Sequence, residues 1–90
     1  MSIDEAIELL QARKGSVRCG ELVATLRSLG FVVESRAKSP SHYTFYHRTR
    51  GRTIFGNFNC GHGKNPVPKA PYITNVIRVL EALRNELRSE

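Results

Sequence analysis

The sequence predicts an α+β domain in which a three-stranded antiparallel sheet carries its helices on one face. Apolar residues recur at helical spacing at both ends of the chain and alternate with polar residues across its middle. Segments that contain glycine or proline separate these stretches. Ninety residues hold one small core, so we treat residues 1–90 as a single domain.

A first helix is predicted over residues 3–13. Ser2 followed by Glu5 forms a capping box, in which each side chain satisfies a backbone N–H of the first turn. Ile3, Ala6, Ile7 and Leu10 then recur at the spacing of one helical face. We expect residues 16–88 to form the core unit and residues 1–15 to carry this helix as an additional N-terminal element.

A second helix follows, with Ser16 as its cap and Gly30 as its stop. Because Gly20 lowers helix propensity, the helix starts at either residue 17 or a position nearer residue 20. The β-branched and aromatic run over residues 31–34 predicts the first strand, and residues 36–40 a connecting loop.

Residues 42–47 and 53–60 predict the second and third strands, joined by a polar hairpin over residues 49–52. Ile54 and Phe58 share one face of the third strand with Cys60, and Gly56 marks either a bulge or a close approach. Glycines and prolines predict an irregular loop over residues 61–71. The final helix is predicted from Pro71 on, which gives the order α-α-β-β-β-α.

Positive charge is concentrated in the middle of the chain. The net charge is +6, and residues 35–80 carry eight basic and no acidic side chains. A structured segment whose charged side chains are all basic is expected of a protein that binds a phosphate backbone. The alternative is a solvated surface with a high isoelectric point.

The termini and the cysteines indicate the compartment. The first residues lack the basic and apolar regions of a secretory signal, and no apolar run approaches the roughly 20 residues of a membrane span. We therefore expect a cytoplasmic protein that is not a membrane protein. In that compartment Cys19 and Cys60 are expected to be reduced thiols.

Two of the three histidines lie in the second predicted strand. If Tyr43 and Phe45 face the core, then His42 faces the open side of the sheet, where it is a candidate for proton transfer on a phosphate-bearing substrate. The alternative is an exposed histidine without a role. His47 has the opposite parity and lies at the end of the strand, so it is expected to be structural or to lie at the rim. The cysteine and histidine spacing matches no tetrahedral zinc pattern, so we expect neither a metal nor a cofactor.

Candidate phosphate-binding residues lie in three places. Lys64 and Lys69 precede the last helix, whose free N–H groups favour an anion, and His62 lies in the same glycine-rich loop. Tyr46 on the open face is placed to stack on an unpaired base. The remaining candidates are Lys38, the hairpin arginines Arg48, Arg50 and Arg52, and Ser41. For each, an ordinary surface role is the alternative.

Four short motifs follow one another over roughly residues 18 to 83: the run from Gly20 to Val33, Ser41-His42 at the start of a strand, His62-Gly63-Lys64, and Tyr72-Ile73-Thr74 in the last helix. Their order resembles that of the HicA toxin family. Pro40 stands where the family has the glycine of its Gly-Ser-His motif. The first helix and residues 65–71 look like additions to the smallest family members.

The resemblance implies a fold like the double-stranded-RNA-binding domain and an mRNA interferase activity, which is an endoribonuclease activity without metal. It also implies a HicB-like antitoxin that forms a hetero-oligomer with the toxin. The family's catalytic histidine falls on His42. Two other hypotheses stay open from the residues themselves: a non-catalytic RNA-binding module of the same fold, and a protein-interaction module with an acidic partner.

Overall fold

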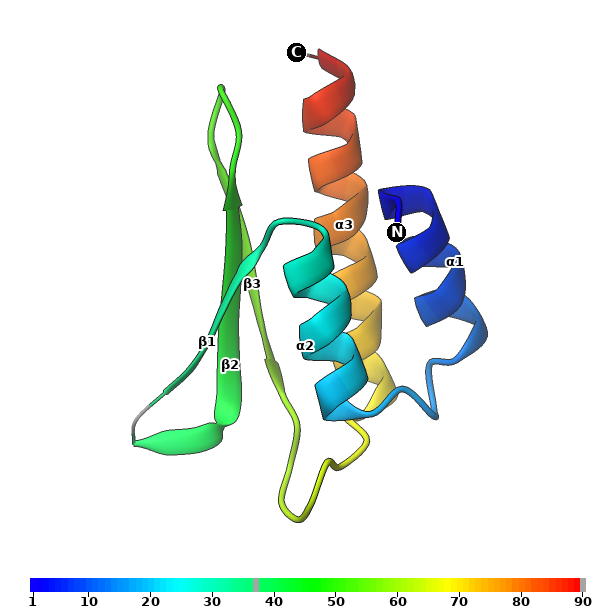
Figure 1. Ribbon diagram of the computed structural model, residues 1–90, viewed down its shortest axis with the longest axis vertical. Coiled ribbons are helices and arrows are strands. Elements are labelled where there is room, and N and C mark those ends of the chain that lie inside the picture. Colours follow the sequence, from blue (N-terminus) through cyan, green and yellow to red (C-terminus); the bar gives the residue numbers. More distant parts are fainter. Residues whose placement is uncertain (37, 90) are drawn as a thin grey trace.

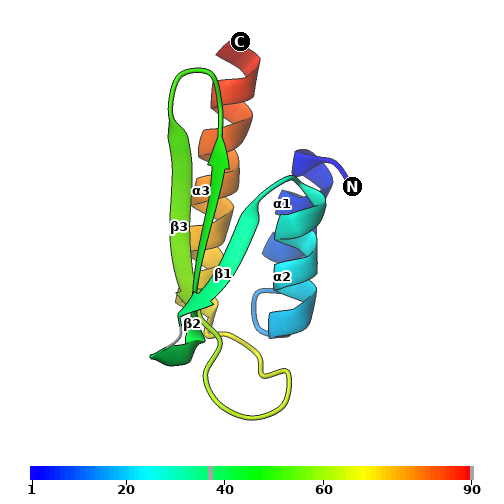
Figure 2. The ribbon, with the colours of Figure 1, turned by 60° about the vertical axis from the view of Figure 1, so that its left-hand side comes forward.

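The computed structural model describes residues 1–36 and 38–89 and confirms the predicted order of elements (Figure 1). A three-stranded antiparallel sheet, with strand order β1-β2-β3, packs against helices on one face. The elements are α1 (Ile3–Ala12), α2 (Cys19–Ser28), β1 (Val32–Arg36), β2 (Ser39–Arg48), β3 (Thr53–Asn59) and α3 (Ala70–Ser89). Figure 2 shows the strands in this order, with α3 behind β3 and α2 beside β1.

Helix α1 begins with the predicted capping box. The Glu5 backbone N–H donates to Ser2 Oγ at 3.1 Å, and the Ser2 N–H donates to Glu5 Oε1 at 3.4 Å. The helix packs on α3, where Asp4 accepts a hydrogen bond from Arg84 at 2.9 Å. It thus lies on the side of α3 away from the sheet (Figure 1), as an added layer.

Helix α2 begins at Cys19 with Arg18 in the cap position, so the prediction that Ser16 caps it is wrong. The Ser16 N–H instead donates to the carbonyl of Arg13 at 2.9 Å, within the turn that ends α1. The predicted stop at Gly30 is confirmed. Gly30 has φ of +91°, a conformation that L side chains rarely adopt.

The face of the sheet toward the helices forms the core. Phe45, Ile54 and Phe58 are buried there as predicted, while Tyr43 is half-buried and stacks on Phe58 with ring centroids 5.2 Å apart. Gly56 lies opposite Phe45, and a Cβ on Gly56 would come within 2.8 Å of that ring. The predicted close approach is therefore confirmed, and the β2–β3 register is regular there.

Pro40 lies in the central strand, where proline is normally excluded because it lacks an N–H for the ladder. The register between β1 and β2 shifts at this point: Ser35 is opposite Tyr43, but Arg36 is opposite Ser39. The shift leaves Pro40 without a partner in β1. The predicted loop over residues 36–40 is shorter than expected because both strands extend into it, and its residue 37 lies outside the described residues.

The long axis of the molecule has two distinct ends (Figure 1). The hairpin between β2 and β3 lies near the C-terminal end of α3, while the loop over residues 61–69 lies at the other end, beside the N-terminal ends of α2 and α3. None of the helices in the described ranges combines the length and the apolar character that crossing a bilayer requires.

Candidate nucleic-acid interface

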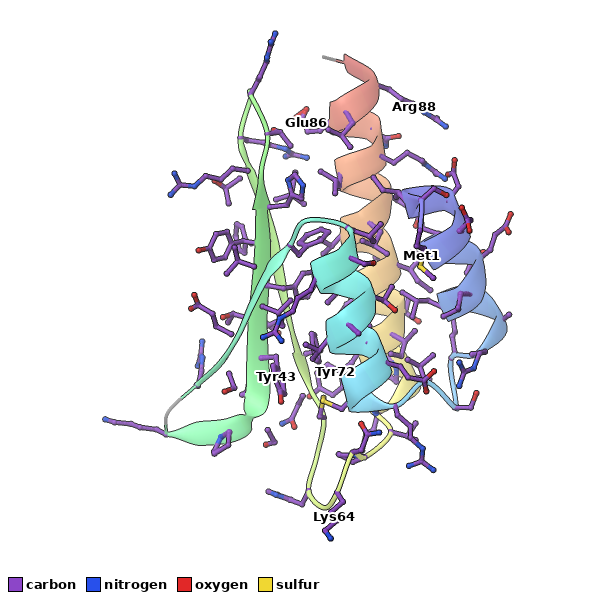
Figure 3. All side chains as sticks on the ribbon, viewed as in Figure 1. Met1, Tyr43, Lys64, Tyr72, Glu86 and Arg88 are labelled. Carbon is purple, nitrogen blue, oxygen red and sulfur yellow. A yellow bond between two sulfur atoms is a disulfide. The ribbon has the colours of Figure 1, made fainter. Side chains whose placement is uncertain are left out.

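A disulfide joins the N-terminal end of α2 to the chain just after β3. Cys19 and Cys60 are 41 residues apart in sequence, yet their Cα atoms lie 5.7 Å apart, and their sulfur atoms form the yellow bond in Figure 3. The prediction of two reduced thiols is therefore wrong. The pairing arises from the packing of α2 beside the end of the sheet, which no local sequence pattern encodes.

Asn65 anchors the same loop to α2. Its Oδ1 accepts a hydrogen bond from the Gly20 N–H at 2.7 Å, and the Cys19 N–H donates to the carbonyl of Pro66 at 2.8 Å. These bonds satisfy the free donors of the first helical turn from outside the helix. They also explain the glycine at position 20, because a Cβ there would lie 2.9 Å from Asn65 Oδ1.

His42 faces away from the helices, on the open side of the sheet, as predicted from the strand alternation. It is half-buried and pairs with Asn59 on β3. The Asn59 side chain bridges two groups: its Oδ1 accepts from the Gly61 N–H at 2.8 Å, and its Nδ2 lies 3.5 Å from His42 Nδ1. Asn59 was not among the predicted site residues.

This bridge indicates the tautomer of a neutral His42. Because the Asn59 oxygen already accepts from Gly61, its amide nitrogen is the group that faces the imidazole. This orientation suits the tautomer in which Nδ1 of His42 accepts and the ring proton is on Nε2. In that tautomer His42 presents an N–H donor at Nε2 on the open face.

His62 and Lys69 lie close to Asn59. A hollow of about 340 Å³ is lined by all three, together with Cys60, Gly61, Val67 and Tyr72. It opens next to the N-terminal end of α3, whose free N–H groups favour an anion. Lys64 is exposed at the tip of the loop (Figure 3). The structure thus brings His62, Lys64 and Lys69 to the end of the sheet that holds His42.

The hairpin arginines lie at the opposite end of β2. Arg48 follows His42 by six residues, which corresponds to about 20 Å along an extended strand. Arg52 forms an ion pair with Glu86 of α3 at 3.0 Å. Arg50 lies in the turn that connects Arg48 to Arg52. The predicted phosphate-binding set is therefore divided between two sites.

The open face between these ends carries aromatic and polar side chains. Tyr46 lies opposite Phe55 of β3 and Val32 of β1, and Phe55 is 72% exposed. Thr44 lies opposite Glu34, which is the acidic side chain of this face within the described sheet. Tyr46 is thus placed as predicted, while Phe55 was missed because its apolar character suggested only strand formation.

Ser41 and Lys38 lie on the other side of the sheet from His42. Both line a cleft between α2, the start of β2 and the loop over residues 61–69. His47 packs edge-on against Phe31 at 5.3 Å between centroids, which fits the predicted structural role.

No group of three or more metal-binding side chains comes together among residues 1–36 and 38–89. The two cysteines are joined to each other and present no thiolate.

Comparison with family models, with curated proteins and with solved structures found no match to this chain. The arguments about function below therefore rest on the geometry of the site and on the motifs in the sequence.

Proposed function

We propose that this protein is an mRNA interferase similar to the HicA toxins, and that His42 takes part directly in RNA cleavage. One observation carries the proposal: a half-buried histidine on the open face of a rigid sheet lies at the end where His62, Lys64, Lys69 and a helix N-terminus gather. This is where a phosphate of the RNA backbone would be bound.

Cleavage without metal requires two proton transfers. A base removes the proton of the ribose 2′-hydroxyl, whose oxygen attacks the adjacent phosphorus, and an acid protonates the 5′-oxygen as the P–O bond breaks. Basic side chains stabilise the charge that develops on the phosphate oxygens. Lys69 is the basic candidate beside Asn59, His62 lines the same hollow, and Lys64 extends from the loop tip.

The role of His42 depends on Asn59. With the Asn59 amide nitrogen toward Nδ1, the tautomer with its proton on Nε2 is the one that would donate to a phosphate oxygen. To act as a base at Nε2, His42 must hold its proton on Nδ1. A half-turn of the Asn59 amide would supply the acceptor for that proton, at the cost of the hydrogen bond from Gly61.

Pro40 replaces the glycine of the family motif, yet the structure requires no glycine there. The described residues with positive φ are Gly30, Gly61, Gly63 and Asn65, so the backbone at position 40 is one that proline adopts readily. Pro40 does remove one N–H that a glycine would offer to phosphate.

A HicB-like antitoxin is the partner that accompanies this function. The open face supports such a partner because Phe55 and Val32 are exposed by 72% and 42%. The substrate places the protein in the cytoplasm, where cellular thiols reduce most disulfides. The oxidised and the reduced forms of the Cys19–Cys60 pair should therefore both be assayed.

The test is induced expression of the wild type, His42→Ala and Thr44→Ala in a bacterial host, with growth and mRNA integrity followed over time. Thr44 shares the strand and the face of His42, so Thr44→Ala is the matched control. Growth arrest and mRNA cleavage are expected for the wild type and the control and are lost in His42→Ala. Purified protein should cleave the same mRNA in the presence of a metal chelator.

The second candidate is a non-catalytic RNA-binding module. Two observations favour it: the side chain that contacts His42 is the amide of Asn59 and not a carboxylate, and basic residues lie at both ends of β2. This candidate predicts intact mRNA in every strain, together with RNA binding that weakens in Lys64→Ala and at higher salt.

A further inference from the structure

A large hollow lies on the helix side of the sheet, away from the open face. It is a cleft of about 840 Å³ between α2, the start of β2 and the loop over residues 61–69. Sites for small ligands typically measure roughly 300 to 1,000 Å³. The cleft is thus large enough for a nucleotide, and among the side chains that line it the cleavage steps proposed above involve His62 alone.

Its charged side chains are of one sign. Arg27 of α2 and Lys38 before β2 line it together with His62, and no acidic side chain does so among the described residues. Arg27 is held in place because its Nη2 donates to the carbonyl of Val33 at 3.1 Å. The rim of the cleft is therefore suited to an anion.

Its walls are apolar and partly aromatic. Tyr43 lines it with Val23 and Ala24 of α2, and the disulfide between Cys19 and Cys60 forms part of the lining. Figure 3 shows Tyr43 on the side of β2 that faces α2. Stacking on Phe58, with planes 9° apart, holds the ring in one orientation. A fixed aromatic ring in an apolar wall favours a flat ligand.

The cleft meets the His42 site at the end of β2. Ser41 lines the cleft, and its neighbour His42 points to the opposite face. His62 lines both the cleft and the hollow beside Asn59. One RNA strand that passes around this end of the sheet would therefore contact both places in adjacent nucleotides.

We propose that the cleft binds one unpaired nucleotide of the RNA, with the base between Tyr43 and α2 and a phosphate at Arg27 and Lys38. This inference rests on the proposed function, since it names the single-stranded form of the substrate. Single-stranded RNA supplies what the cleft requires, because an unpaired base has a free aromatic face and a charged phosphate beside it. A base within a duplex cannot enter.

The test uses Ala24→Trp, which fills the cleft from α2, with Ala12→Trp as the matched control. Ala12 is exposed at the end of α1, on a different part of the surface. Adenosine 5′-monophosphate is titrated into each protein and followed by amide NMR shifts. Binding to a single-stranded ten-nucleotide RNA is measured by fluorescence anisotropy.

The expected result is that the mononucleotide shifts the amides of Tyr43, Ala24 and Arg27. Ala24→Trp should weaken binding of both probes about tenfold or more, as the loss of one base stack does, while Ala12→Trp binds as the wild type does. Arg27→Gln should weaken binding and lower its salt dependence.

Three outcomes would overturn the inference: shifts confined to other residues, equal binding by Ala24→Trp and the control, or inorganic phosphate binding as tightly as the mononucleotide. The last result would show an anion site without base recognition. These results can be distinguished from a failure of the proposed function. A wild type that cleaves mRNA while Ala24→Trp cleaves equally well refutes only the cleft, and a wild type that binds the mononucleotide without cleaving refutes only the catalysis.

Discussion

Reduction of the Cys19–Cys60 disulfide should destabilise the protein strongly without abolishing its fold. A bond that closes a loop of 41 residues lowers the entropy of the unfolded chain. On the chain-entropy estimate this contributes about 4 kcal/mol at 25 °C. For a domain of this size, that is a large fraction of the roughly 5 to 15 kcal/mol that separates folded from unfolded protein.

The assay is urea unfolding of the wild type, followed by circular dichroism with and without a thiol reductant. The reduced protein should unfold at a urea concentration lower by about 2 M, given a slope of about 2 kcal/mol per M. Its melting temperature should fall by about 15 to 30 °C. Cys60→Ala is the matched control, since reductant should leave its unfolding curve unchanged.

The reduced protein should nevertheless remain folded, because the loop keeps other attachments to α2. The Gly20–Asn65 and Cys19–Pro66 hydrogen bonds, at 2.7 and 2.8 Å, do not depend on the disulfide. Coincident unfolding curves for the oxidised and the reduced wild type would refute the argument. Alkylation with mass spectrometry confirms the state of the thiols in each sample.

Three further predictions concern other parts of the molecule. Gly56→Ala should lower the free energy of unfolding by about 1 to 3 kcal/mol in urea titrations, because its Cβ would overlap a core ring; an unchanged midpoint would contradict the packing. Arg13 holds the pKa of Glu21 below its ordinary value through a hydrogen bond. The contribution of this pair to stability is therefore present above the pKa that Glu21 has in the unfolded state, and it is lost as the pH falls through the pKa that Glu21 has in the folded state. Urea titrations from pH 7 to pH 3 should therefore show a larger loss for the wild type than for Glu21→Gln, and parallel curves would exclude the effect. Asn59→Asp supplies a fixed acceptor for a proton on Nδ1 of His42, so this variant should cleave RNA faster if His42 acts as a base. Asn59→Leu removes the contact and should cleave RNA more slowly. Equal cleavage rates in both variants would show that Asn59 takes no part in the mechanism.

Several features of the fold were predictable because they depend on neighbours in sequence. The Ser2–Glu5 capping box and the left-handed Gly30 require only residues within one helical turn. Alternation along each strand predicted that Phe45 faces the core and His42 the open side. At Gly56 the pattern left a bulge and a close approach open, and the structure shows the close approach.

Parts of the candidate site depended on contacts between distant segments. Asn59 becomes a partner of His42 only through the β2–β3 register, and Asn65 caps a helix that begins 46 positions earlier in the chain, at Cys19. The arginines of the hairpin and the lysines of the loop belong to one basic stretch of sequence. Strand β3, which separates the two groups in the chain, nevertheless places them at opposite ends of the molecule (Figure 1).

The sequence by itself determined which segments form helices and strands, which face of each is apolar, and that positive charge is concentrated in the middle of the chain, because hydrogen bonding within a helical turn and side-chain alternation are local properties. Only the tertiary structure decided that Cys19 bonds to Cys60, that Pro40 falls at a register shift, and that Arg27 and Tyr43 line a cleft with Lys38. Those features arise where α2, β2 and the loop pack together. These contacts join segments that are distant in sequence and form only when the whole core packs. The spacing of residues along the chain therefore does not predict them.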